Sequence, residues 1–127
     1  MRVAIDATAA TPFLHDTTTK NVIVAPDGSF SGIVDVDDLC FGDPRYPAAL
    51  TLAVLMATGG PKNYVEAWLR HAGAPDDATF RLYVAAFLLD LMSEHGHAFN
   101  GNEAASTAKA RESLLAAFTE NLLLFQS

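Results

Sequence analysis

Cysteine and basic residues are scarce in this chain of 127 residues. It has one cysteine, and its eight lysine and arginine residues face fifteen aspartate and glutamate residues, which gives a formal net charge of −7. A single cysteine excludes an internal disulfide framework and suits a reducing compartment. The acidic balance argues against nucleic acid or an anionic membrane surface as a partner. We therefore expect a cytoplasmic protein.

Long hydrophobic runs are also missing. The longest one, at residues 48–57, is about half of the ~20 residues that a membrane span needs. No basic region followed by a long apolar segment marks a signal peptide at the start. Half of all residues are nevertheless hydrophobic, which is enough for the core of one domain. We expect a single domain over residues 1–127 that has no contact with a membrane.

Two short apolar runs, residues 22–25 and 29–34, flank the sequence Pro26-Asp27-Gly28. Asp-Gly between β-branched residues favours a β-hairpin, because glycine tolerates positive φ in the tight turn. An antiparallel hairpin brings the start of its first strand beside the end of its second. We therefore expect Asn21 and Asp35 to be neighbours.

Asp16, Asn21 and Asp35 together indicate phosphoryl-transfer chemistry. An amide and a carboxylate that converge from two segments offer the oxygen ligands that Mg²⁺ prefers. A further carboxylate can orient an attacking hydroxyl or accept its proton, and phosphoryl transfer depends mostly on positioning and charge neutralisation. The five-residue spacing from Asp16 to Asn21, with Asp35 after a later strand, matches the order in kinases. Taken singly, each of these residues could also be a turn residue.

Three segments resemble the catalytic core of the aminoglycoside phosphotransferase family. They are residues 14–24 (L-H-D-T-T-T-K-N-V-I-V), residues 32–38 (G-I-V-D-V-D-D) and residues 42–44 (G-D-P). These proteins are small-molecule kinases with a protein-kinase-like fold. The resemblance implies that Asp16 is the catalytic base and that Asn21 and Asp35 bind Mg²⁺, with ATP as the phosphoryl donor. It covers residues 12–46.

The chain departs from that family in three respects. Leu14 stands where the family usually has a histidine, and Val36 stands where it often has a tryptophan. The largest departure is that we find no Gly-rich phosphate loop, no strand with an ATP-binding lysine and no helix with its glutamate partner. The resemblance therefore implies the C-terminal lobe only, without the N-terminal ATP-binding lobe, and weak or absent binding of Mg²⁺ and ATP by this chain alone.

Other polar residues have a functional and a structural interpretation. Lys20, Asp37 and Asp43 are candidates for residues that lie behind the metal ligands and orient them. The structural alternatives are a solvated loop cation for Lys20, an exposed charge for Asp37, and a cap on backbone N–H groups for Asp43. Glu94, His95 and His97 have the composition of a metal site, but histidine also suits a helix C-terminus and Gly96 suits a C-cap.

Helical patterns replace strand patterns after Pro44. The spacing of apolar residues predicts helices over residues 46–58, over residues 61–72, from a cap at residues 75–77 to about residue 94, and from Asn102 to the end of the chain. We therefore predict an α+β protein that is like the C-terminal lobe of a protein kinase. Residues 1–44 would form the catalytic loop and hairpin, and residues 45–127 the helical part.

The predicted function is ATP- and Mg²⁺-dependent phosphoryl transfer to a hydroxyl of a small molecule. One alternative is a non-catalytic dimerisation or binding scaffold descended from such a kinase. Another is a metal-dependent phosphatase of the D-x-D type, which would need several parallel strands. The open apolar strand edge at residues 22–24 invites pairing with another chain, so we expect a homodimer or a complex with a separate N-terminal-lobe chain.

Overall fold

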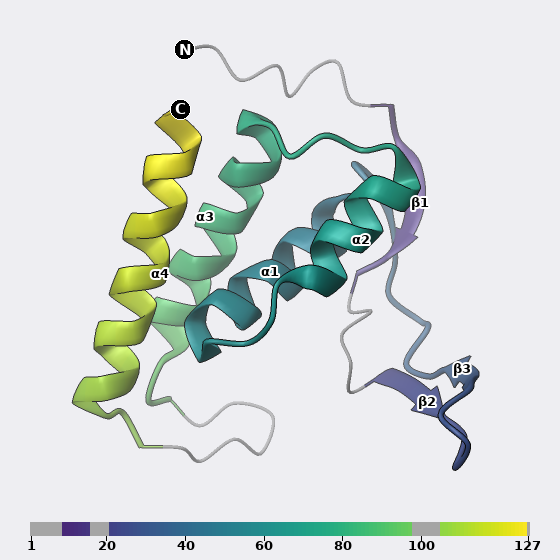
Figure 1. Ribbon diagram of the computed structural model, residues 1–127, viewed down its shortest axis with the longest axis horizontal. Coiled ribbons are helices and arrows are strands. Elements are labelled where there is room, and N and C mark those ends of the chain that lie inside the picture. The colour runs from purple at the N-terminus through teal and green to yellow at the C-terminus, as the bar shows by residue number, and fades with distance from the viewer. Residues whose placement is uncertain (1–8, 16–20, 98–104, 127) are drawn as a thin grey trace. The chain divides into compact units, whose positions relative to one another are not determined.

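The computed structural model describes residues 9–15, 21–97 and 105–126, and for Gln126 the backbone alone. The chain divides into two compact units, Met1–Pro47 (unit 1) and Ala48–Ser127 (unit 2). The described residues form four strands and four helices (Figure 1), which confirms the predicted α+β class. The elements are β1 (Thr11–Leu14), β2 (Val22–Val24), β3 (Phe30–Ile33), β4 (Leu39–Gly42), α1 (Tyr46–Thr58), α2 (Asn63–Ala72), α3 (Ala78–Glu94) and α4 (Ala108–Gln126).

The described residues of unit 1 form two antiparallel sheets of two strands each. The β2–β3 sheet is the predicted hairpin, whereas the β1–β4 sheet was not predicted. In the second sheet Thr11 lies opposite Gly42 and Leu14 opposite Leu39. Pro12 is tolerated in β1 because a two-stranded sheet has only edge strands, so a missing N–H group breaks no central ladder.

The turn of the hairpin depends on Gly28. The carbonyl of Ala25 accepts a hydrogen bond from the Gly28 N–H group at 2.9 Å, and the Ala25 N–H group donates to the Ser29 carbonyl at 2.9 Å. Gly28 has φ +84°, a left-handed conformation that glycine adopts without the steric cost of a Cβ atom. This is a three-residue hairpin loop that closes with glycine in the left-handed region.

The β2–β3 ladder contains an irregularity near its turn. Val24 lies opposite Phe30, but Ile23 lies opposite Gly32, so Ser31 has no residue opposite it. Beyond this bulge Val22 pairs with Ile33, and the pairing is then regular again. The extra residue shifts the register of β3 by one position toward the open end of the hairpin.

Unit 2 has an apolar core to which all four helices contribute. Leu52 and Met56 of α1 and Val65 and Leu69 of α2 are buried, and α3 supplies the two buried phenylalanines, Phe80 and Phe87. Phe80, Val84 and Leu88 of α3 are fully buried, with 0% of their surface exposed. These three residues recur every four positions and therefore form one stripe along the helix.

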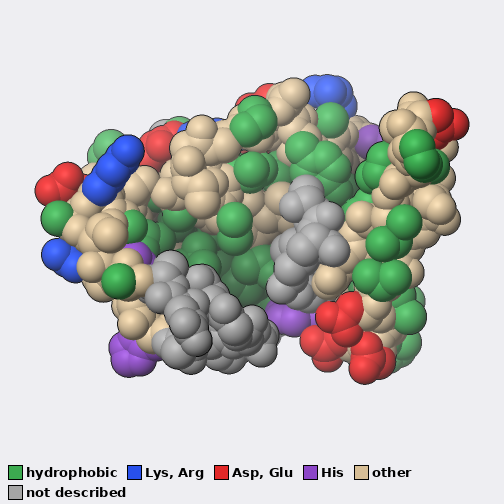
Figure 2. All heavy atoms as spheres, turned by 90° about the horizontal axis from the view of Figure 1, so that it is seen from below, with side chains coloured by type: hydrophobic (Ala, Val, Ile, Leu, Met, Phe, Trp, Pro, Cys, Tyr) green, Lys and Arg blue, Asp and Glu red, His purple; other side chains and the backbone are tan. Residues whose placement is uncertain are grey.

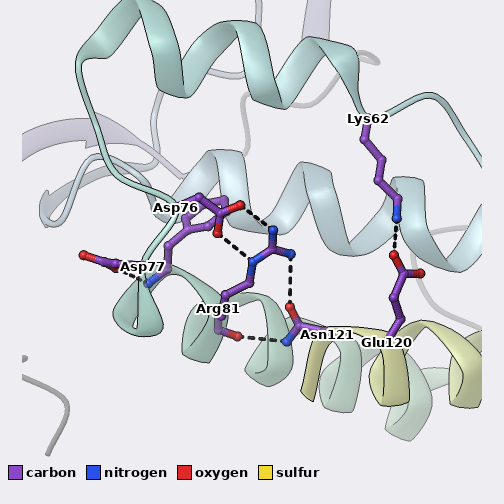
Figure 3. A network of polar contacts seen from close by, with 7 residues as sticks. Lys62, Asp76, Asp77, Arg81, Glu120 and Asn121 are labelled. Carbon is purple, nitrogen blue, oxygen red and sulfur yellow. Dashed lines mark hydrogen bonds and ion pairs between the residues drawn. The ribbon is translucent and has the colours of Figure 1, made fainter. Parts of the chain in front are cut away.

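Helices α3 and α4 lie side by side and antiparallel (Figure 1). A polar network joins them near the start of α3 (Figure 3). The Asn121 side-chain amide donates to the Arg81 carbonyl at 3.0 Å, and the Arg81 guanidinium forms two hydrogen bonds with the Asp76 carboxylate. Asn121 has 0% of its surface exposed. Burial of its amide without hydrogen bonds would be unfavourable, and the hydrogen bonds to Arg81 offset this cost in free energy.

The helix ends agree with the predicted ones except at the starts of α2 and α4. Helix α2 begins at Asn63 rather than at residue 61. Helix α1 has the predicted bounds, and Asp77 caps α3 by accepting a hydrogen bond from the Phe80 N–H group at 3.0 Å. Helix α4 begins at Ala108 rather than near Asn102, which itself lies outside the described residues. Thr107 provides the cap, because its hydroxyl accepts a hydrogen bond from the Ala110 N–H group at 3.2 Å.

Hydrophobic side chains reach the surface, as the space-filling view shows in green (Figure 2). Within the residues that the structure describes, none of the helices has the length and apolar character needed to cross a membrane. The exposed large hydrophobic residues of unit 1 are Ile23, Val24, Phe30, Ile33, Val34, Val36, Leu39 and Phe41.

Candidate functional site

Two backbone hydrogen bonds bracket the segments that carry the predicted site. The His15 N–H group donates to the Asp38 carbonyl at 3.1 Å, and the Val34 N–H group donates to the Asn21 carbonyl at 2.9 Å. We call these the loop-end pairs. One segment, residues 16–20, runs from His15 to Asn21, and the other, residues 35–37, runs from Val34 to Asp38. The residue before each segment is therefore hydrogen bonded to the residue after the other segment.

The loop-end pairs extend the two sheets. His15 follows the last residue of β1, and Asp38 precedes the first residue of β4. Asn21 precedes β2 and Val34 follows β3. Each pair adds one more hydrogen bond to an existing antiparallel ladder, so the two sheets fix where both segments start and end.

Asn21 and Asp35 are neighbours in the backbone, because Asp35 directly follows the partner of Asn21. Asn21 is buried, with 7% of its surface exposed, whereas Asp35 is exposed. Asp35 has φ +60°, a left-handed conformation that is uncommon outside glycine although aspartate adopts it more readily than most residues. Such backbone conformations cluster at functional sites.

The other predicted site residues fall in three places. Asp16 and Lys20 lie outside the described residues. Asp37 is exposed. Among the described residues none forms a hydrogen bond with its side chain, so the geometry does not distinguish a residue near a metal ion from a solvated charge. Asp43 is buried at the junction of β4 and α1, with 8% of its surface exposed.

Asp43 forms a buried ion pair with Arg45. Its carboxylate accepts hydrogen bonds from the guanidinium, at 3.0 Å from Nε to Oδ1 and 2.6 Å from Nη2 to Oδ2. Oδ1 also accepts a hydrogen bond from the Arg45 N–H group at 3.0 Å, in agreement with the predicted cap after the strand. A two-pronged carboxylate–guanidinium pair fixes both side chains in one geometry, so Asp43 stabilises the junction through Arg45.

The ring of Tyr46 packs against His15, the residue that precedes Asp16, and against Phe13. The ring centroid of Tyr46 lies 5.5 Å from that of His15, at an interplanar angle of 30°, and 6.1 Å from that of Phe13, at 44°. These distances are in the range of favourable aromatic pairs. Sequence reasoning assigned no role to Tyr46 or Arg45; the signal that could have identified them is their position directly after Gly42-Asp43-Pro44.

The alternative sites receive little support from the geometry. Among the described residues there is no group of three or more His, Cys, Asp and Glu side chains suited to holding a metal ion, and this includes Glu94, His95 and His97. The D-x-D phosphatase alternative needed parallel strands, whereas both sheets of the described chain are antiparallel.

The chain matches a family model described as the phosphotransferase enzyme family, over residues 5–83. The matched residues include both sheets, the loop-end pairs, the Asp43–Arg45 ion pair and the helices α1 and α2. No curated protein and no solved structure matches the chain.

Proposed function

Because the chain belongs to the phosphotransferase enzyme family, we propose that it carries the base and metal ligands for ATP- and Mg²⁺-dependent phosphoryl transfer. The acceptor is a hydroxyl group of a small molecule. In this proposal Asp16 is the catalytic base, and Asn21 and Asp35 hold the metal ion. Asp37 and Lys20 are nearby charged residues in the sequence, and in this proposal their charges influence how strongly the site binds the metal ion.

The observation that carries the proposal is the two loop-end pairs, which hold the residues that flank the two segments. Asp16 follows His15, which is hydrogen bonded to Asp38. Asp35 follows Val34, which is hydrogen bonded to Asn21. Phosphoryl transfer requires a base and a metal site that are held side by side, since most of its catalysis is positioning and charge stabilisation. The loop-end pairs support the proposal, because they connect the residues that flank the proposed base with the residues that flank the proposed metal ligands.

The residues present fit a magnesium ion. Asn21 and Asp35 offer an amide oxygen and carboxylate oxygens, the hard ligands that Mg²⁺ takes, and Mg²⁺ commonly uses one or two protein carboxylates with substrate phosphates and water. The exposure of Asp35 leaves room for those further ligands. The ion would neutralise charge on the transferred phosphoryl group.

In this proposal the terminal phosphoryl group of ATP is transferred to the acceptor hydroxyl. The acceptor oxygen forms a bond to the terminal phosphorus of ATP, the bond from that phosphorus to the bridging oxygen breaks, and ADP leaves. The hydroxyl proton passes to the Asp16 carboxylate. An acidic protein surface, from the net charge of −7, favours a cationic acceptor.

A second candidate function is a non-catalytic binding or dimerisation scaffold. The observation in its favour is the set of exposed hydrophobic side chains on unit 1, where Phe30 and Phe41 have 68% and 69% of their surface exposed. The two functions are compatible, because a chain that covers this surface could also bring the ATP-binding residues that we did not find in the sequence.

Metal binding tests the proposal. Binding by the chain alone is expected to be weak, so the test uses Mn²⁺, a paramagnetic substitute for Mg²⁺, at a concentration high enough to detect weak binding. We expect it to broaden the amide resonances of Asn21 and Val34 selectively. Asp35→Asn should weaken Mn²⁺ binding at least about tenfold, as loss of metal-site residues does, whereas Asp90→Asn, at an exposed position of α3, should not. Broadening elsewhere, or equal binding by both variants, would contradict the proposed site.

Activity of the chain alone gives the complementary test. We expect calorimetric titration with Mg-ATP to show no binding tighter than roughly millimolar, which corresponds to about −4 kcal/mol. The reason is that no residues were found that would clamp the nucleotide phosphates. Phosphoryl transfer by the chain alone that Asp16→Ala abolishes would show that these residues suffice for catalysis.

A further inference from the structure

The register of the β1–β4 sheet shows which backbone groups point to its open edges. The His15 N–H group donates to the carbonyl of Asp38, the residue opposite it. Hydrogen-bonded pairs alternate with non-hydrogen-bonded pairs along an antiparallel ladder. The next pair, Leu14–Leu39, is therefore of the second kind, and so is the next pair but one. The N–H and carbonyl groups of such pairs point away from the partner strand, to the open edges of the sheet.

Pro12 closes the edge of β1. It lies opposite Phe41 and has no N–H group, so this edge lacks a donor where an added strand would need one. The edge of β4 has no such block, because Leu39–Gly42 contains no proline, no charged residue and no bulge. Among the described residues none forms a hydrogen bond with the outward backbone groups of Leu39 and Phe41.

The edges of the β2–β3 sheet are less open. Proteins blunt exposed strand edges with prolines, bulges and short strands, and β3 contains the bulge at Ser31 while β2 has only three residues. Among the described strands β4 therefore has the least protected edge. It is also apolar, since Leu39 and Phe41 lie on one face of the sheet with 56% and 69% of their surfaces exposed.

We propose that β4 is the interface of a symmetric homodimer, in which two copies of this strand pair antiparallel about a twofold axis at Cys40. In this register Leu39 of each copy lies opposite Phe41 of the other. Both are hydrogen-bonded pairs, with two backbone hydrogen bonds each, and the apposed side chains cover part of each other. Sliding one strand by two residues would leave only one such pair within β4. The edge is thus self-complementary, as a twofold interface requires.

Cys40 reports on this register. On the twofold axis it faces Cys40 of the other copy in a non-hydrogen-bonded pair, with Cα atoms about 4.5 Å apart. A disulfide spans about 4.4–6.8 Å between Cα atoms. Because the chain has one cysteine, any disulfide joins two copies. Mild oxidation of the dimer with diamide should therefore give a covalent dimer on a non-reducing gel.

Hydrogen exchange in the wild-type chain gives the direct test. As the protein concentration rises from the monomeric to the dimeric range, the amides of Leu39 and Phe41 should exchange at least about tenfold more slowly, because they gain acceptors. The Leu14 amide, which points to the edge that Pro12 closes, should stay within about twofold of its rate in the monomer.

Proline substitutions locate the interface. Phe41→Pro removes the outward N–H group, which the β1–β4 ladder does not use, and should weaken association at least about tenfold in sedimentation equilibrium, since each copy loses a donor. The disulfide at Cys40 should be lost with it. Phe41→Val removes the ring but keeps the N–H group, and should weaken association at least about fivefold less than Phe41→Pro. Val24→Pro, at an exposed position of β2, should leave association unchanged within about twofold.

Three outcomes would overturn this dimer. They are a wild-type chain that stays monomeric at the highest soluble concentration, a dimer in which the Leu39 and Phe41 amides stay unprotected, and a dimer that Val24→Pro disrupts and Phe41→Pro does not. If circular dichroism shows that Phe41→Pro does not fold, hydrogen exchange in the wild-type chain decides. None of these measurements involves a metal ion, so they leave the proposed phosphoryl transfer to its own tests.

Discussion

The two units of this protein distribute polar and apolar side chains in opposite ways. In unit 2 the buried positions are mainly hydrophobic, from Ala48 on α1 to Ala117 on α4. In the described part of unit 1 the buried side chains are the polar Asn21, Asp43 and Arg45, together with Pro47. Phe30, Phe41 and six aliphatic residues of the same unit are exposed.

The difference shows that the units are stabilised by different interactions. Unit 2 has the apolar core that normally supplies most of the favourable free energy of folding. Unit 1 depends on two short ladders, the loop-end pairs and one buried ion pair, and a two-stranded sheet alone is marginally stable in water. Exposed apolar residues in such number are typical of a surface that another chain covers.

The largest expected effect is association through unit 1. We predict a homodimer, or a complex with a separate ATP-binding lobe, that buries the exposed hydrophobic residues. Sedimentation equilibrium at micromolar concentration should show the dimer, and a micromolar dissociation constant corresponds to about −8 kcal/mol. Replacing Phe30 and Phe41 with serine should weaken it, while Leu123→Ser on α4 should not. A monomer with residues 1–25 well ordered would refute the prediction.

A matched pair of phenylalanines sharpens the comparison. Phe80→Ala, at a position of α3 with 0% exposure, should lower the free energy of unfolding by about 3–5 kcal/mol. Phe41→Ala, at 69% exposure, should change it by no more than about 0.5 kcal/mol in the monomer. Urea unfolding followed by circular dichroism measures both. A large loss for Phe41→Ala at a concentration where the chain is monomeric would show that unit 1 has an apolar core after all.

Unit 2 also contains one buried polar side chain whose role can be measured. Asn121→Ala removes the hydrogen bond to the Arg81 carbonyl and should lower the free energy of unfolding by about 1–3 kcal/mol, because the carbonyl loses its partner from α4. Asn63→Ala, at an exposed position of α2, is the matched control and should cost no more than about 0.5 kcal/mol. Equal losses in urea unfolding would mean that the α3–α4 network contributes nothing specific.

The smallest effect concerns the turn of the hairpin. The Ser29 hydroxyl donates to the Asp27 carboxylate at 2.7 Å, and the Ser29 N–H group donates to it at 2.9 Å. These hydrogen bonds, the first more than the second, hold the pKa of Asp27 below its ordinary value of 3.8. Because the pKa of Asp27 is lower in the folded chain, its charged carboxylate stabilises the fold when the pH is above the ordinary pKa. This stabilisation is lost as the pH falls through the lowered pKa. Ser29→Ala should raise the pKa of Asp27 in an NMR titration, and Ser93→Ala should not.

Local patterns in the sequence predicted much of this fold. Helix α1 has the bounds that its apolar spacing indicates, and the cap at Asp77 and the hairpin around Gly28 follow from residues close together in the chain. The β1–β4 sheet was not predicted because it joins residues as distant as Thr11 and Gly42, and neither strand has a strong pattern of its own. The sequence indicates an earlier start of α4, because Asn102 is also a residue type that caps helices, whereas Thr107 provides the cap.

The candidate site was predictable only in part, for a similar reason. A hairpin places the ends of its strands together, so the proximity of Asn21 and Asp35 in the backbone followed from Asp27-Gly28. The packing of Tyr46 on His15 depends on how the chain turns after Pro44, which residue types alone do not fix. The roles of Asp16 and Lys20 stay predictions.

The bulge at Ser31 has a consequence for insertions and deletions in this chain. Asp35 is exposed, and its place beside Asn21 is set by the number of residues that separate it from the turn, one of which the bulge accommodates. Substitutions at exposed positions of β3 leave that number unchanged. Adding or removing one residue outside the bulge would move Asp35 along the strand by about 3.3 Å and turn the following side chains to the opposite face. This hairpin should therefore tolerate changes of residue type more readily than changes of length.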